Sequence, residues 1–349
     1  MQHEIVAFTP ADASREQWRL LHDFRRNWHT ETRPDDPFDP DDVFEKSLLH
    51  KDPFSETVRW LSLAKGEPVG YLRISRHTPA SPEYESNKHL VRASGEILPV
   101  FRRQGLGTTF AKMLHDLMED WNTHVSTAWT DEEDGHSFLK ALGAGAKYTE
   151  ADNRLDLADV DWELMQSWVD DAATRSPGTK VLIFENRFPG ELLEEYLPVY
   201  TEIHNDMPLE DLDKGAQIYD ASRWSEINDW FTQVGAAHHT CIARDPDGQI
   251  SALTDVVYQP ATPRFIQQWA TGVPKHHRGR GLGKAVKATM LLRLKELYPD
   301  ARFILTGNAN SNDPMLSINH AMGFRKHRDW VGYQFSSETL GQWLASRQS

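Results

Sequence analysis

The stretch HHRGRGLGKAVK, from His276 to Lys287, lies in the second half of the chain and has the composition of a loop that holds an anion. Glycines have no side chains, so backbone N–H groups can turn toward one point. The residues that follow favour helix, and the amino end of a helix carries a partial positive charge. We therefore predict a phosphate-binding turn between a strand and a helix.

Two common phosphate loops do not fit this stretch. A nucleoside-triphosphate loop, G-x-x-x-x-G-K-[ST], would need a glycine at Arg278 and a hydroxyl at Ala285. A dinucleotide loop, G-x-G-x-x-G, would need its third glycine at Lys284. What remains is R-x-x-G-x-G, from Arg278 to Gly283. Its glycine backbone, arginine and helix amino end together suit a pyrophosphate and require no metal.

The same pattern occurs earlier in the chain, in ILPVFRRQGLGTTFAKML, from Ile97 to Leu114. The two loops are 176 positions apart, measured from Gly105 to Gly281. Downstream, a glycine that follows a helix pattern recurs after 180 positions, at Gly143 and Gly323. Such regular spacing predicts two copies of one fold.

Each copy shows the same coarse order of elements. A first strand precedes a helix, over 14–28 in the first half and 190–204 in the second. Further strands lead into the glycine loop, a helix leaves it, and a strand, a helix and a strand follow. Both halves then end in a helix with a tryptophan, Trp168 or Trp343. The turn signal in RSPGTK places the boundary between domains 1–176 and 177–349. Strands and helices mixed around one sheet indicate an α/β or α+β fold.

This order of elements around R-x-x-G-x-G resembles the GNAT superfamily of acetyltransferases. The later pattern Asn312-x-x-Met315-x-x-x-Asn319-x-x-x-Gly323 resembles a second hallmark of that family. Two such domains in one chain are similar to the tandem GNAT proteins, of which mycothiol synthase is the best-known type. The resemblance implies that each domain has a mixed, mostly antiparallel sheet, flanked by helices, with a splayed central strand pair.

The resemblance also implies acetyl-CoA as the cofactor, bound along the strand before each loop and on the loop backbone. In the second half the implied contacts are Thr271, Gly272, Val273, Arg278, Gly279, Arg280, Gly281, Leu282, Gly283, Lys284 and Asn312. In the first half they are Ile97, Leu98, Arg102, Arg103, Gln104, Gly105, Leu106, Gly107 and Thr108. A backbone N–H near Thr271 to Val273 would face the thioester carbonyl.

Asn319 stands where many relatives carry a tyrosine that acts as the general acid. An amide can donate a hydrogen bond but cannot release a proton at neutral pH, so Tyr333 is a substitute candidate. At the positions that match Asn312 and Asn319, the first half has Glu132 and Leu139. We therefore expect a degenerate first domain and a catalytic second domain.

An alkylamine with a pKa of about 10.4 must lose a proton before it attacks. The candidate bases in the second half are Asp255, Glu202, His204, Asp206 and Glu210. In the first half, Glu96 lies on the equivalent strand. The acidic segment from Tyr200 to Asp220 is expected to line the acceptor site, where carboxylates would suit a cationic amine.

Composition restricts the partners. With 52 acidic and 38 basic residues the net charge is −14, which disfavours nucleic acid and anionic lipid. The single cysteine, Cys241, is expected to be a buried thiol in a reducing compartment. We see no signal peptide, apolar membrane span or metal-ligand spacing, so the cytoplasm is expected and no metal. The oligomeric state stays open.

Two functions follow from this reading. The first is an N-acetyltransferase that moves an acetyl group from acetyl-CoA to an amine of a small molecule by direct attack in a ternary complex. The alternative is a non-catalytic protein that binds acyl-CoA and serves as a sensor or scaffold. The two retained loops and Asn312 favour the enzyme, whereas the missing tyrosine favours the alternative.

Overall fold

The computed structural model describes residues 3–347 and divides into two compact units. Unit 1 contains the residues up to Tyr148, the segment Glu210–Ala216 and the residues from Trp330 onward. Unit 2 contains Thr149–Leu209 and Gln217–Asp329. Each unit therefore combines segments from both halves of the sequence. The repeats 1–176 and 177–349 stay a prediction about the sequence, which the contacts within these units do not test.

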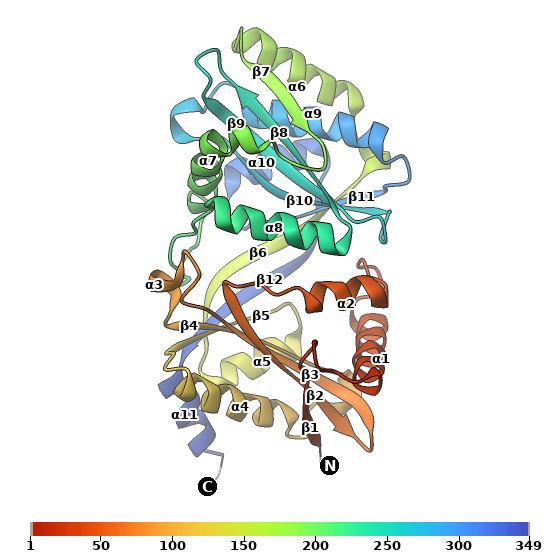
Figure 1. Cartoon of the computed structure of the whole chain (residues 1–349), viewed down its shortest axis with the longest axis vertical. Coiled ribbons are helices and arrows are strands. Elements are labelled where there is room, and N and C mark those ends of the chain that lie inside the picture. Colours follow the sequence, from red (N-terminus) through yellow and green to blue (C-terminus); the bar gives the residue numbers. More distant parts are fainter. Residues whose placement is uncertain (1–2, 348–349) are drawn as a thin grey trace. The chain divides into compact units, whose positions relative to one another are not determined.

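Unit 1 has its strands in the order β1-β2-β3-β4-β5-β12 (Figure 1). Its strands are β1 (Glu4–Ala7), β2 (Ser55–Ala64), β3 (Glu67–His77), β4 (Leu90–Ile97), β5 (Val125–Thr130) and the second half of β12 (Arg325–Ser336). Its helices are α1 (Arg15–Thr32), α2 (Asp41–Leu49), α3 (Tyr84–Asn87), α4 (Leu106–Asp120), α5 (Glu133–Leu142) and α11 (Ser337–Ala345).

Unit 2 has its strands in the order β6-β11-β10-β9-β8-β7. Its strands are most of β6 (Gly145–Asp156), β7 (Lys180–Phe184), β8 (Ala237–Arg244), β9 (Ile250–Tyr258), β10 (Phe265–Gly272) and β11 (Phe303–Ala309). Its helices are α6 (Trp162–Arg175), α7 (Leu193–Asn205), α8 (Ala221–Val234), α9 (Leu282–Leu297) and α10 (Asp313–Met322).

Each unit contains one parallel strand pair, and in both units that pair separates after three residues. β4 pairs with β5 from Leu90 to Arg92 and then continues to Ile97 paired with β3 but not with β5. β10 pairs with β11 from Phe265 to Gln267 and then continues to Gly272. The pairs β1–β2, β2–β3, β3–β4, β5–β12, β6–β11, β7–β8, β8–β9 and β9–β10 are antiparallel. The predicted fold class, with its splayed central strand pair, is confirmed.

Apolar side chains fill both faces of each sheet. In unit 1, Phe110, Leu114 and Trp343 bring α4 and α11 onto one face, while Leu20, Leu21 and Phe24 of α1 belong to a second cluster. In unit 2, Trp168 of α6 packs with Leu282 and Val286 of α9, and Tyr196 and Tyr200 of α7 cover the other face. The two tryptophan helices predicted at the end of each half therefore contribute to the cores, with Trp343 in unit 1 and Trp168 in unit 2.

The two halves of the sequence exchange one strand each. β12, from the end of the chain, pairs with β5 of unit 1, from Val331 opposite Thr130 to Ser336 opposite Val125. β6, from the first half, pairs with β11 of unit 2, from Phe303 opposite Asp156 to Ala309 opposite Glu150. Each sheet is thus completed by a strand from the other half of the sequence.

Candidate functional site

The loop between β10 and α9 forms an open backbone turn in unit 2. Gly279 and Gly281 have φ of +82° and +80°, a region that other residues rarely adopt. Gly281 is the N-cap of α9, and no side chain caps the helix there. A Cβ added at Gly279 would meet nothing within 4 Å. The N–H groups of the first turn are therefore free of a side-chain cap and suit an anion.

Unit 1 builds the same turn between β4 and α4. Arg103 has φ of +61° and Gly105 has φ of +91°, and Gly105 is the N-cap of α4 without a side-chain cap. Gln104 and Gly105 are exposed, whereas Leu106 is buried and anchors the helix. Both turns thus keep a backbone geometry that fits a diphosphate, which agrees with the loops singled out in the sequence.

In each turn, the loop arginine donates a hydrogen bond to the backbone at the end of the preceding strand. Nε of Arg102 donates to the Ile97 carbonyl at 3.0 Å, and Nε of Arg278 donates to the Val273 carbonyl at 3.2 Å. Their remaining nitrogens meet carboxylates, Glu132 at 2.5 Å for Arg102 and Asp206 for Arg278. From the sequence we predicted that these arginines bind the phosphate. In the structure they also hold the loop through hydrogen bonds to backbone carbonyls.

β10 differs from β4 by a β-bulge. The pairing of β10 with β9 shifts between Gln268 opposite Val256 and Thr271 opposite Thr254. β4 pairs with β3 without a shift, from Gly70 opposite Ile97 to Ser75 opposite Arg92. A bulge leaves backbone groups outside the ladder and turns them in a new direction. Only the unit 2 strand therefore presents extra backbone donors where it leaves β11.

Similarity to known proteins agrees with this geometry, although no family model matches the chain. The tandem GNAT protein from the clavulanic acid biosynthesis pathway, in a structure without AcCoA, has a TM-score of 0.76 at 21% identity; the match covers 96% of this chain and 99% of that one. The chain has the tandem GNAT fold. The GCN5-related N-acetyltransferase from Sphaerobacter thermophilus is also similar to it, with a TM-score of 0.63, 15% identity and 96% of each chain covered.

A curated relative extends the likeness to sequence. The mycothiol acetyltransferase of Salinispora arenicola (strain CNS-205) is 24% identical over 303 residues, which cover 86% of this chain and 88% of that protein. Acetyl transfer is the activity that the names of these relatives share, and it is the activity that their likeness to this tandem GNAT fold supports.

Asp255 is fully buried under α7 of the tandem GNAT fold. Its Oδ2 accepts hydrogen bonds from Tyr200 Oη at 3.1 Å and from His238 Nε2 at 2.9 Å, and the residue is 0% exposed. Beside it, Gln268 Nε2 donates to the Asp255 carbonyl at 2.7 Å and to Thr254 Oγ1 at 3.0 Å. Burial raises the pKa of Tyr200 well above its usual value. This cluster holds the bulge in place and is closed to solvent at Asp255.

Asn319 and Asn312 have separate roles on α10. Asn319 is buried, and its Nδ2 donates to Asn308 Oδ1 at 2.7 Å on the separated end of β11. Asn312 is the N-cap of α10, and its Oδ1 accepts from the N–H of Met315 at 3.4 Å. Asn319 therefore positions β11 and has no proton to release, as its residue type predicts. The Asn312 side-chain nitrogen stays available for the cofactor role that the resemblance implies.

Tyr333 comes from the second half of the sequence but belongs to unit 1. It is buried in β12 opposite Ala128, and its hydroxyl lies 3.0 Å from His136 Nδ1 of α5. Asn319 and Asp255, by contrast, both belong to unit 2. The sequence could not show this placement, because it depends on which sheet β12 completes.

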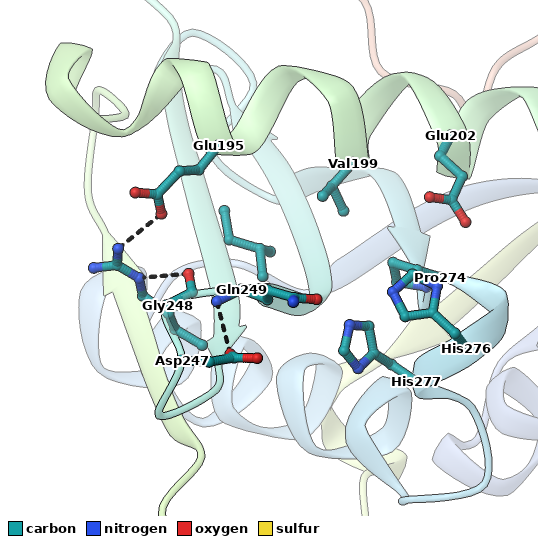
Figure 2. A pocket seen from close by; sticks show the side chains of 11 residues that line it. Glu195, Val199, Glu202, Asp247, Gly248, Gln249, Pro274, His276 and His277 are labelled. Carbon is teal, nitrogen blue, oxygen red and sulfur yellow. Dashed lines mark hydrogen bonds and ion pairs between the residues drawn. The ribbon is translucent and has the colours of Figure 1, made fainter.

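Glu202 lines a surface pocket of about 540 Å³ in unit 2 (Figure 2). Three residues of α7 point into the pocket, opposite the turn before Gly279; the lining includes Glu195, Val199, Glu202, Gln249, Pro274, His276 and His277. Glu195 already pairs with Arg244 at 2.7 Å. Glu202 is exposed, so it is a carboxylate that an incoming molecule can reach.

The other candidate bases are spread over both units. His204 Nδ1 lies 2.9 Å from the Tyr200 carbonyl, and Asp206 pairs with Lys275 at 2.8 Å as well as with Arg278. Burial acts to raise the pKa of Asp206, but hydrogen bonds from Lys275 and Arg278 outweigh it and lower the pKa. Glu210 begins the segment of the second half that belongs to unit 1, so the acidic stretch is divided between the two units.

The remaining loop residues mainly support the turn. Arg280 binds Asp245 through two nitrogens, at 2.7 and 2.8 Å, and this contact lowers the pKa of Asp245. Lys284 is exposed, with Nζ 4.9 Å from the Trp168 ring centre. A Cβ on Gly283 would lie 3.2 Å from Val273 Cγ2, so glycine allows α9 to approach the end of β10 closely.

Several expectations about composition can be compared with the structure. Cys241 is 0% exposed, and burial raises the pKa of its thiol, so it is a buried thiol as predicted. Among residues 3–347, no group of three or more His, Cys, Asp and Glu side chains could hold a metal ion. No helix in this described range is both long and apolar enough to cross a bilayer.

Proposed function

We propose that the chain is an N-acetyltransferase that moves an acetyl group from acetyl-CoA to an amine of a small-molecule acceptor, by direct attack while both are bound. One observation carries this proposal: a parallel strand pair that separates and leads into an uncapped helix through a left-handed glycine, built twice. A backbone turn of this kind suits the diphosphate of CoA. The names of the relatives support acetyl transfer as the reaction.

We assign acetyl transfer to unit 2, because its strand β10 has the β-bulge. The main-chain N–H groups of residues 279–284 would hold the diphosphate of acetyl-CoA. Beyond Gln267, β10 no longer pairs with β11, so its backbone can bind an extended arm. When bound, acetyl-CoA supplies a thioester with an electrophilic carbonyl carbon. Backbone donors at residues 269–271 would favour the negative charge that develops on the carbonyl oxygen.

The proton of the attacking amine needs an acceptor. The ammonium form of the acceptor first loses one proton to a base. The C–N bond then forms as the C–S bond breaks, CoA leaves as a thiolate, and a second proton from the nitrogen balances the protonation of that thiolate to the CoA thiol. Asp255 is closed to solvent and already accepts two hydrogen bonds. Glu202 is exposed in the pocket beside Pro274. We therefore propose that Glu202 binds the cationic end of the acceptor and takes up its proton.

An assay with the full chain tests this function. Acetyl-CoA is mixed with a panel of polyamines, amino acids, aminated sugars and peptides, and free thiol and acetylated product are measured together. We expect thiol release with at least one acceptor, matched by a mass increase of that acceptor. Thiol release without an acetylated product would be hydrolysis and would contradict transfer.

The alternative, a protein that binds acyl-CoA without turnover, gives a different result in the same experiment. It predicts heat on binding of CoA in a calorimeter and no thiol release with any acceptor on the panel. An absence of binding heat together with an absence of turnover would overturn both functions.

A further inference from the structure

One face of the unit 1 sheet carries three arginines from three neighbouring strands. Residues directly opposite one another in β2, β3 and β4 form three rows: Thr57, Ser75 and Arg92; Arg59, Arg73 and Ser94; Leu61, Tyr71 and Glu96. Cross-strand partners share a face, as do alternate residues of one strand. Tyr71 identifies this face as the one under α1, because its ring lies 6.2 Å from that of Phe24.

Arg73 lies at the centre of this arginine face and repels its two neighbours. It stands directly opposite Arg59, and like charges in such positions are destabilising. Loss of hydration lowers the pKa of Arg59 and of Arg92, and the charge of Arg73 lowers both further. Arg73 and Arg92 nevertheless reach solvent. A ligand in solvent can therefore reach both side chains.

Within residues 3–347, no ion pair links Arg59, Arg73 or Arg92 to a carboxylate. Arg59 donates to the Thr57 carbonyl at 3.3 Å and also makes a side-chain hydrogen bond with the neutral Tyr71, while its Nε is buried without a partner. By contrast, Arg76 on the other face of β3 binds Glu56 at 2.7 Å. In a chain with 52 acidic residues, three adjacent arginines without a carboxylate partner indicate that something else supplies the negative charge.

Glu96 is the carboxylate on this face, and it is engaged elsewhere. Its Oε1 accepts from Ser94 Oγ at 2.7 Å, while Oε2 is buried without a partner. Burial raises the pKa of the Glu96 carboxyl, and the hydrogen bond from Ser94 and the charge of Arg73 oppose this rise only in part. Glu96 also lies on the part of β4 that has left β5. An incoming ligand on the arginine face would therefore reach the place where the strands separate.

We propose that the arginine face of unit 1 is a binding site for a small molecule that carries an oxyanion, a carboxylate or a phosphate, held by Arg59, Arg73 and Arg92. Guanidinium groups bind either oxyanion through paired N–H groups. This inference goes beyond the proposed function, because the acceptor site assigned to unit 2 is acidic and the proposed turnover does not need this face. The two units then take ligands of opposite charge.

Calorimetry on the full chain tests the site with two probes, succinate and inorganic phosphate, and with spermidine as a cationic control. CoA is kept saturating, so that both backbone turns are filled before the probe is added. We expect succinate, phosphate or both to bind, and we expect any binding heat of spermidine, which the proposed acceptor site of unit 2 can take, to be unchanged by Arg73→Gln. Arg73→Gln should weaken anion binding at least tenfold, whereas Arg76→Gln, on the same strand but ion-paired, should leave it unchanged.

Thermal melting separates a binding role from a structural one. Because Arg73 repels two neighbours, Arg73→Gln should melt at the same temperature as the wild type or higher. A lower melting temperature together with unchanged anion binding would show that the arginine is structural and would overturn the site. If Arg73→Gln does not fold, Arg92→Gln provides the same comparison. Failure of both anions to bind the wild type also overturns the site and leaves acetyl transfer unaffected.

Discussion

Gly281→Glu should weaken CoA binding at the unit 2 turn on the order of 100-fold, close to 2.7 kcal/mol. The new carboxylate would lie at the N-cap of α9 and compete with the diphosphate for the same N–H groups. Space is not the obstacle, because the nearest atom to an added Cβ is Arg175 Nη1 at 3.9 Å. Gly105→Glu should do the same in unit 1, where an added Cβ meets nothing within 4 Å.

Two other glycines provide matched controls for backbone strain. Gly235 in unit 2 and Gly66 in unit 1 also have positive φ, +72° and +84°, and no atom within 4 Å of an added Cβ. Their glutamate variants should suffer the same strain, about 1–2 kcal/mol, and keep CoA binding. Calorimetry should count two sites in the wild type, one in each single loop variant and none in the double variant.

Turnover then assigns the chemistry to a unit. If the second half transfers the acetyl group, Gly281→Glu loses turnover and Gly105→Glu keeps it. The reverse pattern would move the reaction to unit 1 and contradict the role given to the bulge in β10. Equal binding of CoA by the wild type and the double variant would show that the backbone turns do not hold the cofactor.

Lys287→Met should raise the free energy of unfolding by up to about 4 kcal/mol at pH 7. Lys287 is 2% exposed among the apolar residues of α9, and burial lowers its pKa from 10.5 to about 7. Its Nζ lies 5.3 Å from the Phe324 ring centre, and within residues 3–347 no carboxylate pairs with it. Methionine has a similar length and carries no charge to desolvate.

The stability difference between Lys287→Met and the wild type should depend on pH. Between the folded pKa of about 7 and the unfolded value of 10.5, the unfolded chain binds more protons than the folded chain. Wild-type stability should therefore rise with pH across this window, and the advantage of Lys287→Met should shrink to about 1 kcal/mol near pH 10. Denaturant unfolding at pH 7 and 10 measures both.

Lys295→Met is the control for the loss of a lysine from the same helix. Lys295 is exposed on α9, with Nζ 4.0 Å from the Trp162 ring centre. Its replacement should change stability by less than about 1 kcal/mol at either pH. A Lys287→Met variant that is less stable than the wild type at both pH values would show that the ammonium group makes a favourable buried contact.

Features that depend on short stretches of sequence could be predicted. The turns at Gly105 and Gly281 depend on residues that are neighbours in the chain, so R-x-x-G-x-G predicted their place between a strand and a helix. The splayed strand pair came with the family resemblance and is confirmed in both units. Helix α8 was not anticipated, although Asp220 caps it and Gly235 ends it, because its apolar residues alternate with many polar ones.

Features that depend on distant pairing could not be predicted. Tyr333 follows Asn319 closely in sequence but belongs to unit 1, because β12 completes the sheet beside β5. The burial of Asp255 follows from the tyrosines of α7, more than fifty positions earlier in the chain. The arginine face was not predicted from the sequence either, because Arg59, Arg73 and Arg92 become neighbours only through the register of three strands.

The strand exchange has a consequence for biosynthesis. While the ribosome is still translating the second half, β5 has no partner on the side that β12 later occupies, and an open strand edge invites pairing with other chains. Unit 1 can close this edge only after residues 330–336 have left the exit tunnel. The first domain to be translated is thus the last to be finished, and a gene fragment cut at codon 176 would encode a sheet with a permanently open side.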